Sequence, residues 1–365
     1  MATNVGIHGI GIYLPEEIRR NDWWPAAVVD SWRQKREQRL PSISKIVEGD
    51  GATEAAGSNA AAVMAAIGEY AGDQFQGSVE RRVAPDSMTA SEMEVRAASD
   101  AIERAGVRAD EIGFVLSHSA LADYHLCANA CAVKESLGLP LRCLTLGVEL
   151  ACNSFAPQLE VAESLVQSGR HRYGLLVQSS LGTRLVPKEQ PASALFGDGA
   201  TAVVVGPVAE GYGVLGRAHY SDGAYFRGVV SGVPGKRWYD EGRVVMYVED
   251  AGLARETFLF IGDRSKQAIE TALAEAKLTA GDVAFYACHQ ATAWIRKFTQ
   301  ANAGLTRARA IDTFPWTTSI FSANVPLILA LAEREGSLLE GDVITTFAGG
   351  LGFTWSSMVA RWGRG

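Results

Sequence analysis

The chain has 365 residues, with 34 Lys and Arg against 41 Asp and Glu, and a formal net charge of −7 at pH 7. This length allows two or three packed units or one large duplicated fold, and a hydrophobic fraction of 47% excludes wholesale disorder. The acidic balance argues against a nucleic-acid partner, and no apolar run approaches the roughly 20 residues that span a bilayer. Five Cys residues without a CxxC spacing indicate neither a disulfide framework nor a metal site. We therefore expect a soluble cytoplasmic protein without membrane or nucleic-acid partners.

The predicted elements alternate between helices and short apolar strands, which is typical of an α/β protein. Residues 37–76 are rich in Ala, Gly and Ser, and we interpret them as an insertion on the main fold. In chain order the elements are a strand at 5–14, a helix at 60–70, a helix, turn and strand at 101–120, a strand at 143–148, a helix at 153–169, strands at 173–178 and 201–205, a second helix, turn and strand at 272–291, a helix at 327–335 and a strand at 343–347.

An internal repeat underlies this order. Residues 101–120 can be laid over residues 272–291 without gaps, and six positions are then identical, among them His118 and His289. Each copy is a helix with apolar residues three and four apart, a polar turn, and a strand that is apolar without alternation. The repeat predicts two similar α/β halves that pack as one body.

Cys152 follows an apolar strand and stands at the start of a predicted helix. The free N–H groups and partial positive charge of a helix N-terminus favour a thiolate, which is the form that attacks thioesters. The alternative is inert packing, which we expect for Cys127, Cys131, Cys143 and Cys288 because they lack this placement. Position alone leaves both interpretations of Cys152 open.

His289 lies just past a buried strand, where ligands collect in doubly wound sheets. A histidine there can accept a proton or donate a hydrogen bond to a thioester carbonyl. Its repeat-mate His118 occupies the equivalent place, and the repeat alone does not choose between the two. Gly349 and Gly350 follow another strand. They are either ordinary turn residues without a functional role, or they allow backbone N–H groups to approach a reacting carbonyl.

Taken in order, these segments resemble the thiolase superfamily, and within it the β-ketoacyl-acyl-carrier-protein synthase III group, over nearly the whole chain. The resemblance implies a duplicated thiolase fold with five layers, α-β-α-β-α. It implies an N-terminal half at 1–206 with the nucleophile and a C-terminal half at 207–365 with the catalytic histidine. The motifs that carry it are the opening G-x-x-x-P strand at 9–15, Ala-Cys-x-x-Phe at 151–155, Phe-Gly-Asp-Gly-Ala at 196–200, His-Gln-Ala at 289–291, and the Gly-Gly ending with its Arg-Trp pair at 347–362.

The resemblance assigns the nucleophile to Cys152 and the catalytic histidine to His289, and it leaves His118 as structural. The family's catalytic Asn falls on Ser319, and Asn324 lies five residues later. In condensing members the His and Asn together hydrogen-bond the enolate oxygen formed when a malonyl thioester loses CO2. Removing one such donor costs about 3–4 kcal/mol, so decarboxylative condensation is disfavoured whereas acylation of Cys152 is not.

The function expected from this departure is transfer of the acyl group from Cys152 to a hydroxyl or amine acceptor. His289 would be the base, oriented by Ser319 or by an unidentified residue, and backbone N–H groups of Cys152 and of Gly349 or Gly350 would bind the oxyanion. Glu149 is a further candidate to assist, as a base or as a paired carboxylate, and so is Asn324. Some family members in polyketide and other secondary-metabolite pathways have likewise lost the Asn and form esters.

The resemblance also concerns ligands and assembly. Trp32 and Arg36 match the pair that holds the adenine of coenzyme A in the family. No permanently bound cofactor is expected, because the donor is an acyl-CoA or the acylated pantetheine of a carrier protein. The insertion either folds over the mouth of the family's substrate tunnel and disfavours coenzyme A as the donor, or is a surface elaboration without a catalytic role. Family members are homodimers, and residues 121–132 match the segment that reaches the partner.

Two other functions stay in competition with the acyltransferase. One is a starter-unit ketosynthase that decarboxylates a malonyl thioester, and the other is a non-catalytic partner subunit of a family heterodimer. The presence of both Cys152 and His289 speaks against the second. The sequence names neither the acyl chain nor the acceptor.

Overall fold

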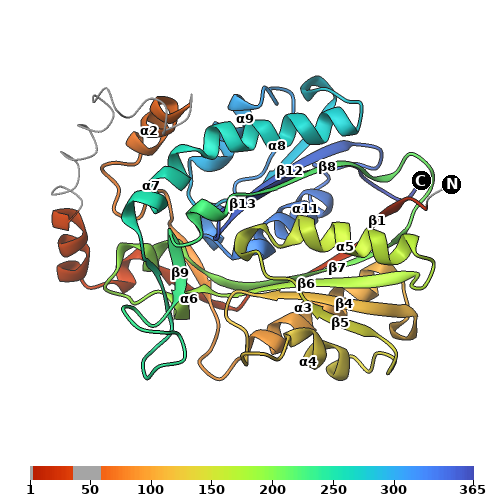
Figure 1. Ribbon diagram of the computed structural model, residues 1–365, viewed down its shortest axis with the longest axis horizontal. Coiled ribbons are helices and arrows are strands. Elements are labelled where there is room, and N and C mark those ends of the chain that lie inside the picture. The colour runs from red at the N-terminus through yellow and green to blue at the C-terminus, as the bar shows by residue number, and fades with distance from the viewer. Residues whose placement is uncertain (1–2, 36–58) are drawn as a thin grey trace.

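The computed structural model describes residues 3–35 and 59–365. Two sheets and three layers of helices alternate in it, with outer helices above and below and one pair of helices between the sheets (Figure 1). This is the five-layer duplicated fold expected from the sequence, which is confirmed. Arg36 and most of the predicted insertion lie outside the described residues.

The first sheet has five strands in the order β1-β7-β6-β4-β5. Strands β4 and β6 are parallel, as are β4 and β5, whereas β7 runs antiparallel to both of its neighbours. Apolar runs without alternation produce β6 and β7, which are buried on both faces. Edge strand β5 differs from this expectation, because Leu144 and Leu146 are exposed. The strands are β1 (Val5–Tyr13), β4 (Ile112–Ser119), β5 (Leu144–Gly147), β6 (Tyr173–Leu181) and β7 (Asp198–Pro207).

The second sheet repeats this pattern with four strands in the order β11-β12-β13-β8. Its parallel pair is β11 and β12, and its antiparallel pairs are β12 with β13 and β13 with β8. The two repeat copies fold alike, each as a helix, a 3-10 turn and the strand that carries a histidine at its end. The division at residue 206 stays a prediction. The strands are β8 (Gly213–Ser221), β11 (Phe285–Cys288), β12 (Val343–Gly350) and β13 (Thr354–Arg361).

The middle layer consists of α5 (Phe155–Gln167) and α11 (Asn324–Arg334). Their apolar residues form one buried cluster with strands of both sheets, which joins the two halves. Helix α5 ends where expected, since Gly169 adopts a left-handed φ of 73°. Helix α11 begins three residues earlier than predicted. Pro326 is tolerated because the first N–H groups of a helix have no intrahelical partner.

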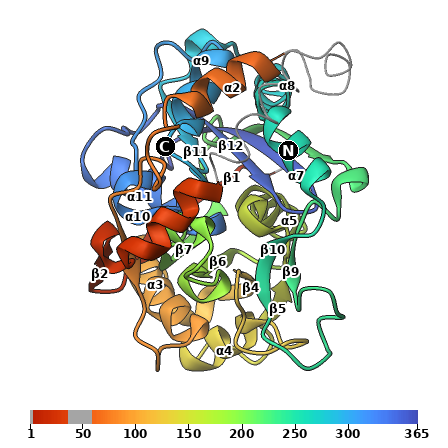
Figure 2. The same cartoon turned by 90° about the vertical axis from the view of Figure 1, so that its left-hand side faces the viewer.

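The outer layers cover the far faces of the sheets. Helix α3 (Ala90–Ala105) packs on β1 and β7, and α4 (Asn129–Ser136) lies beside it on β4 and β5. Helix α3 starts with a capping box between Thr89 and Glu92. Helices α8 (Ile261–Glu275) and α9 (Ile295–Asn302) cover the second sheet. Helix α2 (Ala60–Gly68), shorter than predicted, belongs to the described part of the insertion and lies against α7 and α8 (Figure 2).

Shorter elements complete the described residues, among which no helix is long and apolar enough to span a membrane. Residues 26–35 are helical. The others are β2 (Glu17–Arg20), β3 (Glu80–Val83), α6 (Gly182–Leu185), β9 (Val229–Gly232), β10 (Val245–Val248), α7 (Ala251–Leu259) and α10 (Phe314–Thr317), with single 3-10 turns at Asn21–Trp23, Ala109–Glu111, Ala151–Asn153, Pro191–Leu195, Gly223–Tyr225, Ala280–Asp282 and Phe321–Ala323.

Candidate active site

A cavity of about 290 Å³ lies where the ends of β11 and β12 meet the turn before α5. Five predicted site residues line it together: Cys152, His289, Ser319, Gly349 and Gly350. Most of the remaining wall is apolar. It combines residues of β9, β10, α7 and the start of α8 with residues of β12, β13, α9 and the turns between elements. These wall residues are Ala192, Leu195, Phe196, Val229, Met246, Val248, Ala254, Phe258, Ile261, Ile295, Phe321, Phe347, Leu351, Phe353 and Trp355.

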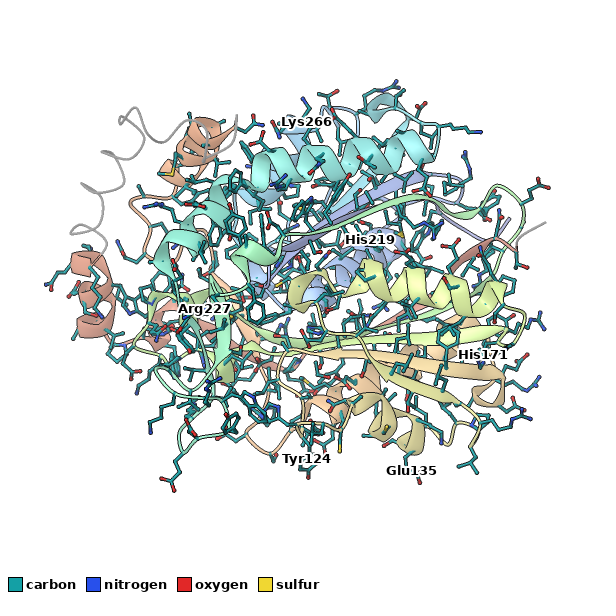
Figure 3. The ribbon with its side chains drawn as sticks, viewed as in Figure 1. Tyr124, Glu135, His171, His219, Arg227 and Lys266 are labelled. Carbon is teal, nitrogen blue, oxygen red and sulfur yellow. The ribbon has the colours of Figure 1, made fainter. Side chains whose placement is uncertain are left out.

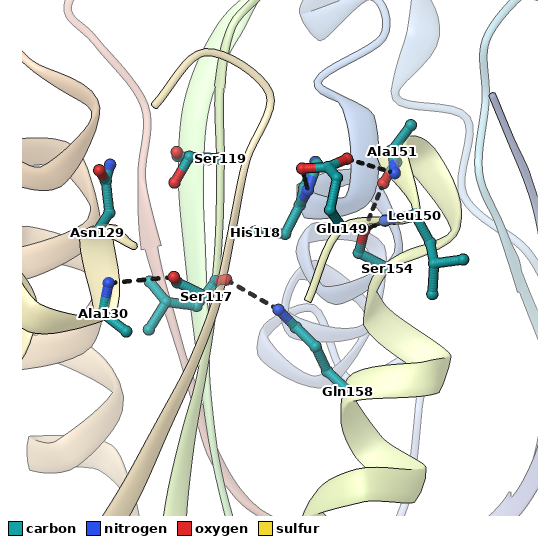
Figure 4. A network of polar contacts seen from close by, with 12 residues as sticks. Ser117, His118, Ser119, Asn129, Ala130, Glu149, Leu150, Ala151, Ser154 and Gln158 are labelled. Carbon is teal, nitrogen blue, oxygen red and sulfur yellow. Dashed lines mark hydrogen bonds and ion pairs between the residues drawn. The ribbon is translucent and has the colours of Figure 1, made fainter. Parts of the chain in front are cut away.

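Cys152 lies in the 3-10 turn Ala151–Asn153, three residues before the first residue of α5, and is 9% exposed. Ala151 adopts a left-handed φ of 49°, and the Ser154 hydroxyl braces the turn. This hydroxyl accepts the N–H of Leu150 at 2.9 Å and donates to the Ala151 carbonyl at 2.9 Å (Figure 4). The structure differs from the thiolate expected at a helix N-terminus, because Cys152 is buried in a turn ahead of the helix. Burial raises the pKa of Cys152 to about 12, and the charge of Glu149 adds to the rise.

Gly350 allows β12 to approach the Cys152 turn. A Cβ added at Gly350 would lie less than 3.0 Å from the Leu150 carbonyl oxygen and 3.0 Å from the Asn153 Cβ. At Gly349 an added Cβ would meet only the Thr354 carbonyl oxygen, at 3.9 Å. The backbone of Gly350 is therefore pressed against the turn that carries the thiol.

His289 follows β11 and is 4% exposed. Its backbone N–H donates to the Phe347 carbonyl at 2.8 Å, which fixes it beside the end of β12. Neither ring nitrogen has a hydrogen-bond partner among the described residues. Burial lowers the pKa of His289 to about 4, against a weak opposing effect of the Phe321 backbone, so the imidazole is neutral at pH 7.

Ser319 is fully buried, and its backbone is held between Leu195 and Gly197. Its N–H donates to the Leu195 carbonyl at 2.9 Å, and its carbonyl accepts the N–H of Gly197 at 3.0 Å. The Ser319 hydroxyl accepts only a long bond of 3.4 Å from the N–H of Phe321. This leaves the hydroxyl hydrogen free to turn toward a ligand in the cavity.

Asn324 does not line the cavity, and its carboxamide makes two buried bonds elsewhere. Its Oδ1 accepts the N–H of Gln290 at 2.7 Å, and its Nδ2 donates to the Thr313 hydroxyl at 3.0 Å. Gln290 in turn accepts the N–H groups of Thr313 and Phe314. Asn324 thus holds the residue that follows His289 and does not reach the cavity itself.

Glu149 also lies off the cavity, where it is paired. It accepts from the ring of His118 at 3.1 Å and from the N–H of Ala151 at 2.9 Å (Figure 4). Partial desolvation opposes ionisation of the carboxyl. The hydrogen bond and charge of His118 outweigh this effect, so the pKa of Glu149 lies below its usual value.

The predicted adenine clamp does not fit the structure. Trp32 is 1% exposed, packs against Trp24 and Phe75, and donates from its ring nitrogen to the Glu189 carbonyl at 2.8 Å. The ring is covered by protein, which contradicts the predicted ligand-binding role of Trp32, and Arg36 lies outside the described residues. None of residues 59–76, the described part of the insertion, lines the cavity.

Sequence reasoning missed several residues of the cavity. Phe321 stacks on Phe196 with ring centroids 5.2 Å apart, and its left-handed φ of 52° follows no motif. Arg264 lies with its guanidinium 4.7 Å from the ring of Trp355. The β9, β10 and α7 wall carries no local signal, because only the tertiary fold brings these residues to Cys152. Within residues 3–35 and 59–365 no cluster of His, Cys, Asp or Glu could hold a metal ion.

The chain is similar in sequence to known proteins. Residues 146–223 match the family model described as 3-oxoacyl-[acyl-carrier-protein] synthase III, and residues 273–362 match the model of its C-terminal part. The chain is 28% identical to β-ketoacyl-[acyl-carrier-protein] synthase III 1 of Bacillus cereus, over 99% of this chain and 100% of that protein.

Two solved structures share the fold at lower identity. The 3-oxoacyl-(acyl carrier protein) synthase III of Pseudomonas aeruginosa superposes with a TM-score of 0.76 at 24% identity, covering 98% of each chain. The priming β-ketosynthase of the R1128 polyketide biosynthetic pathway gives a TM-score of 0.77 at 22% identity, covering 100% of this chain and 97% of that one.

Proposed function

Because this chain is a ketosynthase III-like protein of the thiolase superfamily, we propose that it is an acyltransferase that carries its acyl group on Cys152. The acyl group would come from a thioester and pass to a hydroxyl or amine acceptor. One observation carries the proposal: Cys152 and a neutral His289 line the same apolar cavity, while a serine occupies the third position. The apolar wall suits an acyl chain, since burying apolar surface favours binding.

Loading of Cys152 is the first step. The sulfur bonds to the thioester carbonyl carbon while its proton passes to a ring nitrogen of His289. The C–S bond to the donor then breaks, and the donor leaves as a thiol with the proton from His289. Since the pKa of Cys152 is about 12 and that of His289 about 4, the resting pair is thiol and neutral imidazole. The proton therefore moves during the reaction and is not transferred beforehand.

In the transfer step Cys152 is the leaving group and the acceptor is the nucleophile. An acceptor hydroxyl or amine gives its proton to His289 as its oxygen or nitrogen bonds to the acyl carbon. The bond to the Cys152 sulfur breaks, and the sulfur takes the proton back. The N–H of Cys152 and one from Gly349 or Gly350 would bind the oxyanion in both steps. The Ser319 hydroxyl would orient the acceptor.

Decarboxylative condensation is the second candidate, and the similarity to proteins named as synthases favours it. A condensing enzyme must stabilise an enolate, and loss of one donor costs about two to three orders of magnitude in rate. Ser319 would replace a carboxamide donor in this role. Asn324 does not line the cavity, and its carboxamide holds the N–H of Gln290 and the hydroxyl of Thr313 instead. A non-catalytic subunit would need neither the thiol nor the imidazole.

We also propose that the donor is an acyl-CoA or an acylated carrier protein and that the chain forms a homodimer. Within residues 121–132, Tyr124 is 75% exposed and Leu126 fully exposed, and Tyr124 projects from the surface in Figure 3. Beside them β5 is an edge strand with exposed leucines. Exposed apolar side chains next to an open sheet edge are typical of a strand that pairs with another chain.

The test is intact-protein mass spectrometry after incubation with a panel of acyl thioesters, with and without a malonyl donor. We expect one acyl group per chain, its loss in Cys152→Ala, and its retention in Cys143→Ala, a buried thiol away from the cavity. His289→Ala should slow transfer to an acceptor more than loading. Acyl mass on Cys152→Ala would overturn the assignment of the nucleophile.

Release of CO2 from the malonyl donor distinguishes the two enzymatic candidates. The acyltransferase should release little CO2, and Ser319→Asn should increase that release. Rapid decarboxylative condensation by the unmodified protein would refute the acyltransferase and favour the synthase.

A further inference from the structure

His118 and Glu149 form a pair that the proposed reaction does not use. They lie at the ends of two adjacent parallel strands, since His118 is the last residue but one of β4 and Glu149 comes two residues after the end of β5. The Val148 N–H extends this pairing by donating to the Ser117 carbonyl at 2.9 Å. The fold therefore brings the imidazole and the carboxylate together at the carboxyl edge of the sheet, which is also where Cys152 lies.

The His118 ring anchors the carboxylate from inside the protein. The His118 side chain is 1% exposed, whereas that of Glu149 is 70% exposed. The Nδ1 of His118 lies 3.1 Å from one oxygen of Glu149, and its Nε2 has no hydrogen-bond partner among the described residues. An exposed carboxylate normally samples many rotamers, so this buried contact restricts its position.

The other oxygen of Glu149 holds the turn that carries the thiol. It accepts the N–H of Ala151 at 2.9 Å, and Ala151 immediately precedes Cys152. Ala151 has a φ of 49°, a conformation that costs a non-glycine residue about 1 kcal/mol or more. A strained residue needs external contacts to stay in place. Glu149 supplies one of them and the Ser154 hydroxyl supplies another (Figure 4).

We propose that Glu149, held by His118, is a positioning residue that fixes the Ala151–Cys152 backbone for attack on the thioester. The proposal rests on the proposed role of Cys152 as the acylated residue. Glu149 acts through a hydrogen bond to the backbone and not through a proton transfer. Glu149→Gln should therefore retain this positioning role, because a glutamine oxygen can still accept the N–H of Ala151. The glutamine Nε2 can donate to His118 if the ring adopts its other neutral tautomer.

The experiment measures the rate of Cys152 acylation against thioester concentration for four variants. Glu149→Ala should lower the saturating rate by about 10- to 100-fold, the range expected for loss of a hydrogen bond to a charged group. The half-saturating concentration should change little, because the cavity wall is intact. Glu149→Gln should restore the rate to within about threefold, whereas Glu149→Asp, one methylene shorter, should not. Glu103→Ala, which removes an exposed carboxylate of α3, is the matched control.

Two results would overturn the proposal. One is a Glu149→Ala rate equal to that of Glu103→Ala, and the other is a Glu149→Gln variant as slow as Glu149→Ala. If Glu149→Ala does not fold, the acylation rates of Glu149→Gln and Glu149→Asp are compared instead. A Glu149→Gln variant that is as slow as Glu149→Asp would then overturn the proposal. Failure of the nucleophile assignment, on which the proposal rests, would look different, because Cys152→Ala would then be acylated like the unmodified protein.

Discussion

Replacement of the two adjacent glycines at the end of β12 should have opposite consequences. Gly349 and Gly350 are both in β12, and neither has a positive φ, so alanine is allowed at both by backbone conformation. Alanine reduces the entropy of the unfolded chain equally at the two positions, which is worth about 0.4–1 kcal/mol of stability. The two variants therefore differ only in what the new methyl group contacts.

The contacts predict the size of the difference. At Gly350 the methyl group would press on the Leu150 carbonyl oxygen, the Asn153 Cβ at 3.0 Å and the Thr354 hydroxyl at 3.1 Å. Asn153 cannot move easily, because its side chain donates to Thr354 at 3.2 Å and accepts from Ser356. Overpacking of this kind costs about 1–3 kcal/mol. Gly350→Ala should therefore lower the free energy of unfolding by about that amount, and Gly349→Ala should leave it unchanged or slightly raised.

Urea unfolding followed by tryptophan fluorescence and circular dichroism measures this difference. The acylation rate of Cys152 is a second readout, because Leu150 belongs to the backbone of the Cys152 turn and must shift in Gly350→Ala. We expect a lower urea midpoint and slower acylation for Gly350→Ala than for Gly349→Ala. Equal midpoints and equal acylation rates would refute the close approach of β12 to the turn.

Three further predictions concern the thiol, the histidine and the assembly. Because burial raises the pKa of Cys152 to about 12, its alkylation by iodoacetamide should rise about tenfold per pH unit between pH 7 and pH 10, and a plateau below pH 9 would contradict this. Asn324→Ala removes the bond that holds Gln290, the residue after His289, so loading of Cys152 and acyl transfer should both slow by about tenfold. Transfer at the unmodified rate would exclude that role. Light scattering at micromolar concentration should give a dimer mass, and Leu126→Asp should weaken the dimer. A monomer mass for the unmodified chain would contradict the assembly.

The layers of the fold are predictable from sequence because their signals are local. A buried strand is a short apolar run, and an outer helix has apolar residues three and four apart, so residues 101–120 and 272–291 identify one unit each. The exposed leucines of β5 show where this reasoning ends. An apolar run predicts a strand, but whether that strand has a neighbour on both sides depends on the whole chain.

The site was only partly predictable for a related reason. Motifs indicate which residues stand at a turn. Five residues selected in this way line one cavity in the structure: Cys152, His289, Ser319, Gly349 and Gly350. Motifs do not determine what else contacts each side chain. Trp32 has the spacing of a ligand-binding pair, yet Trp24 and Phe75 cover its ring. The thiolate expected from a helix N-terminus is likewise outweighed by burial, which depends on the surrounding walls.

The positions of Ser319 and Asn324 connect the chemistry to the fold. Asn324 is the nearest carboxamide in sequence to the expected one, but its Oδ1 and Nδ2 are both used to hold the segment after His289. Turning it toward the cavity would leave the buried N–H of Gln290 and the hydroxyl of Thr313 without these partners, at a cost of about 1–3 kcal/mol for each group. His289 then shares the cavity only with the Ser319 hydroxyl at the position where a condensing enzyme needs a second donor. A tetrahedral oxyanion can instead be bound by backbone N–H groups, and the approach of Gly350 to the Cys152 turn brings two such backbones together. All side chains that the acyltransferase reaction needs are therefore present in the site. Condensation needs a second side-chain donor, and the nearest carboxamide, that of Asn324, holds Gln290 and Thr313 instead.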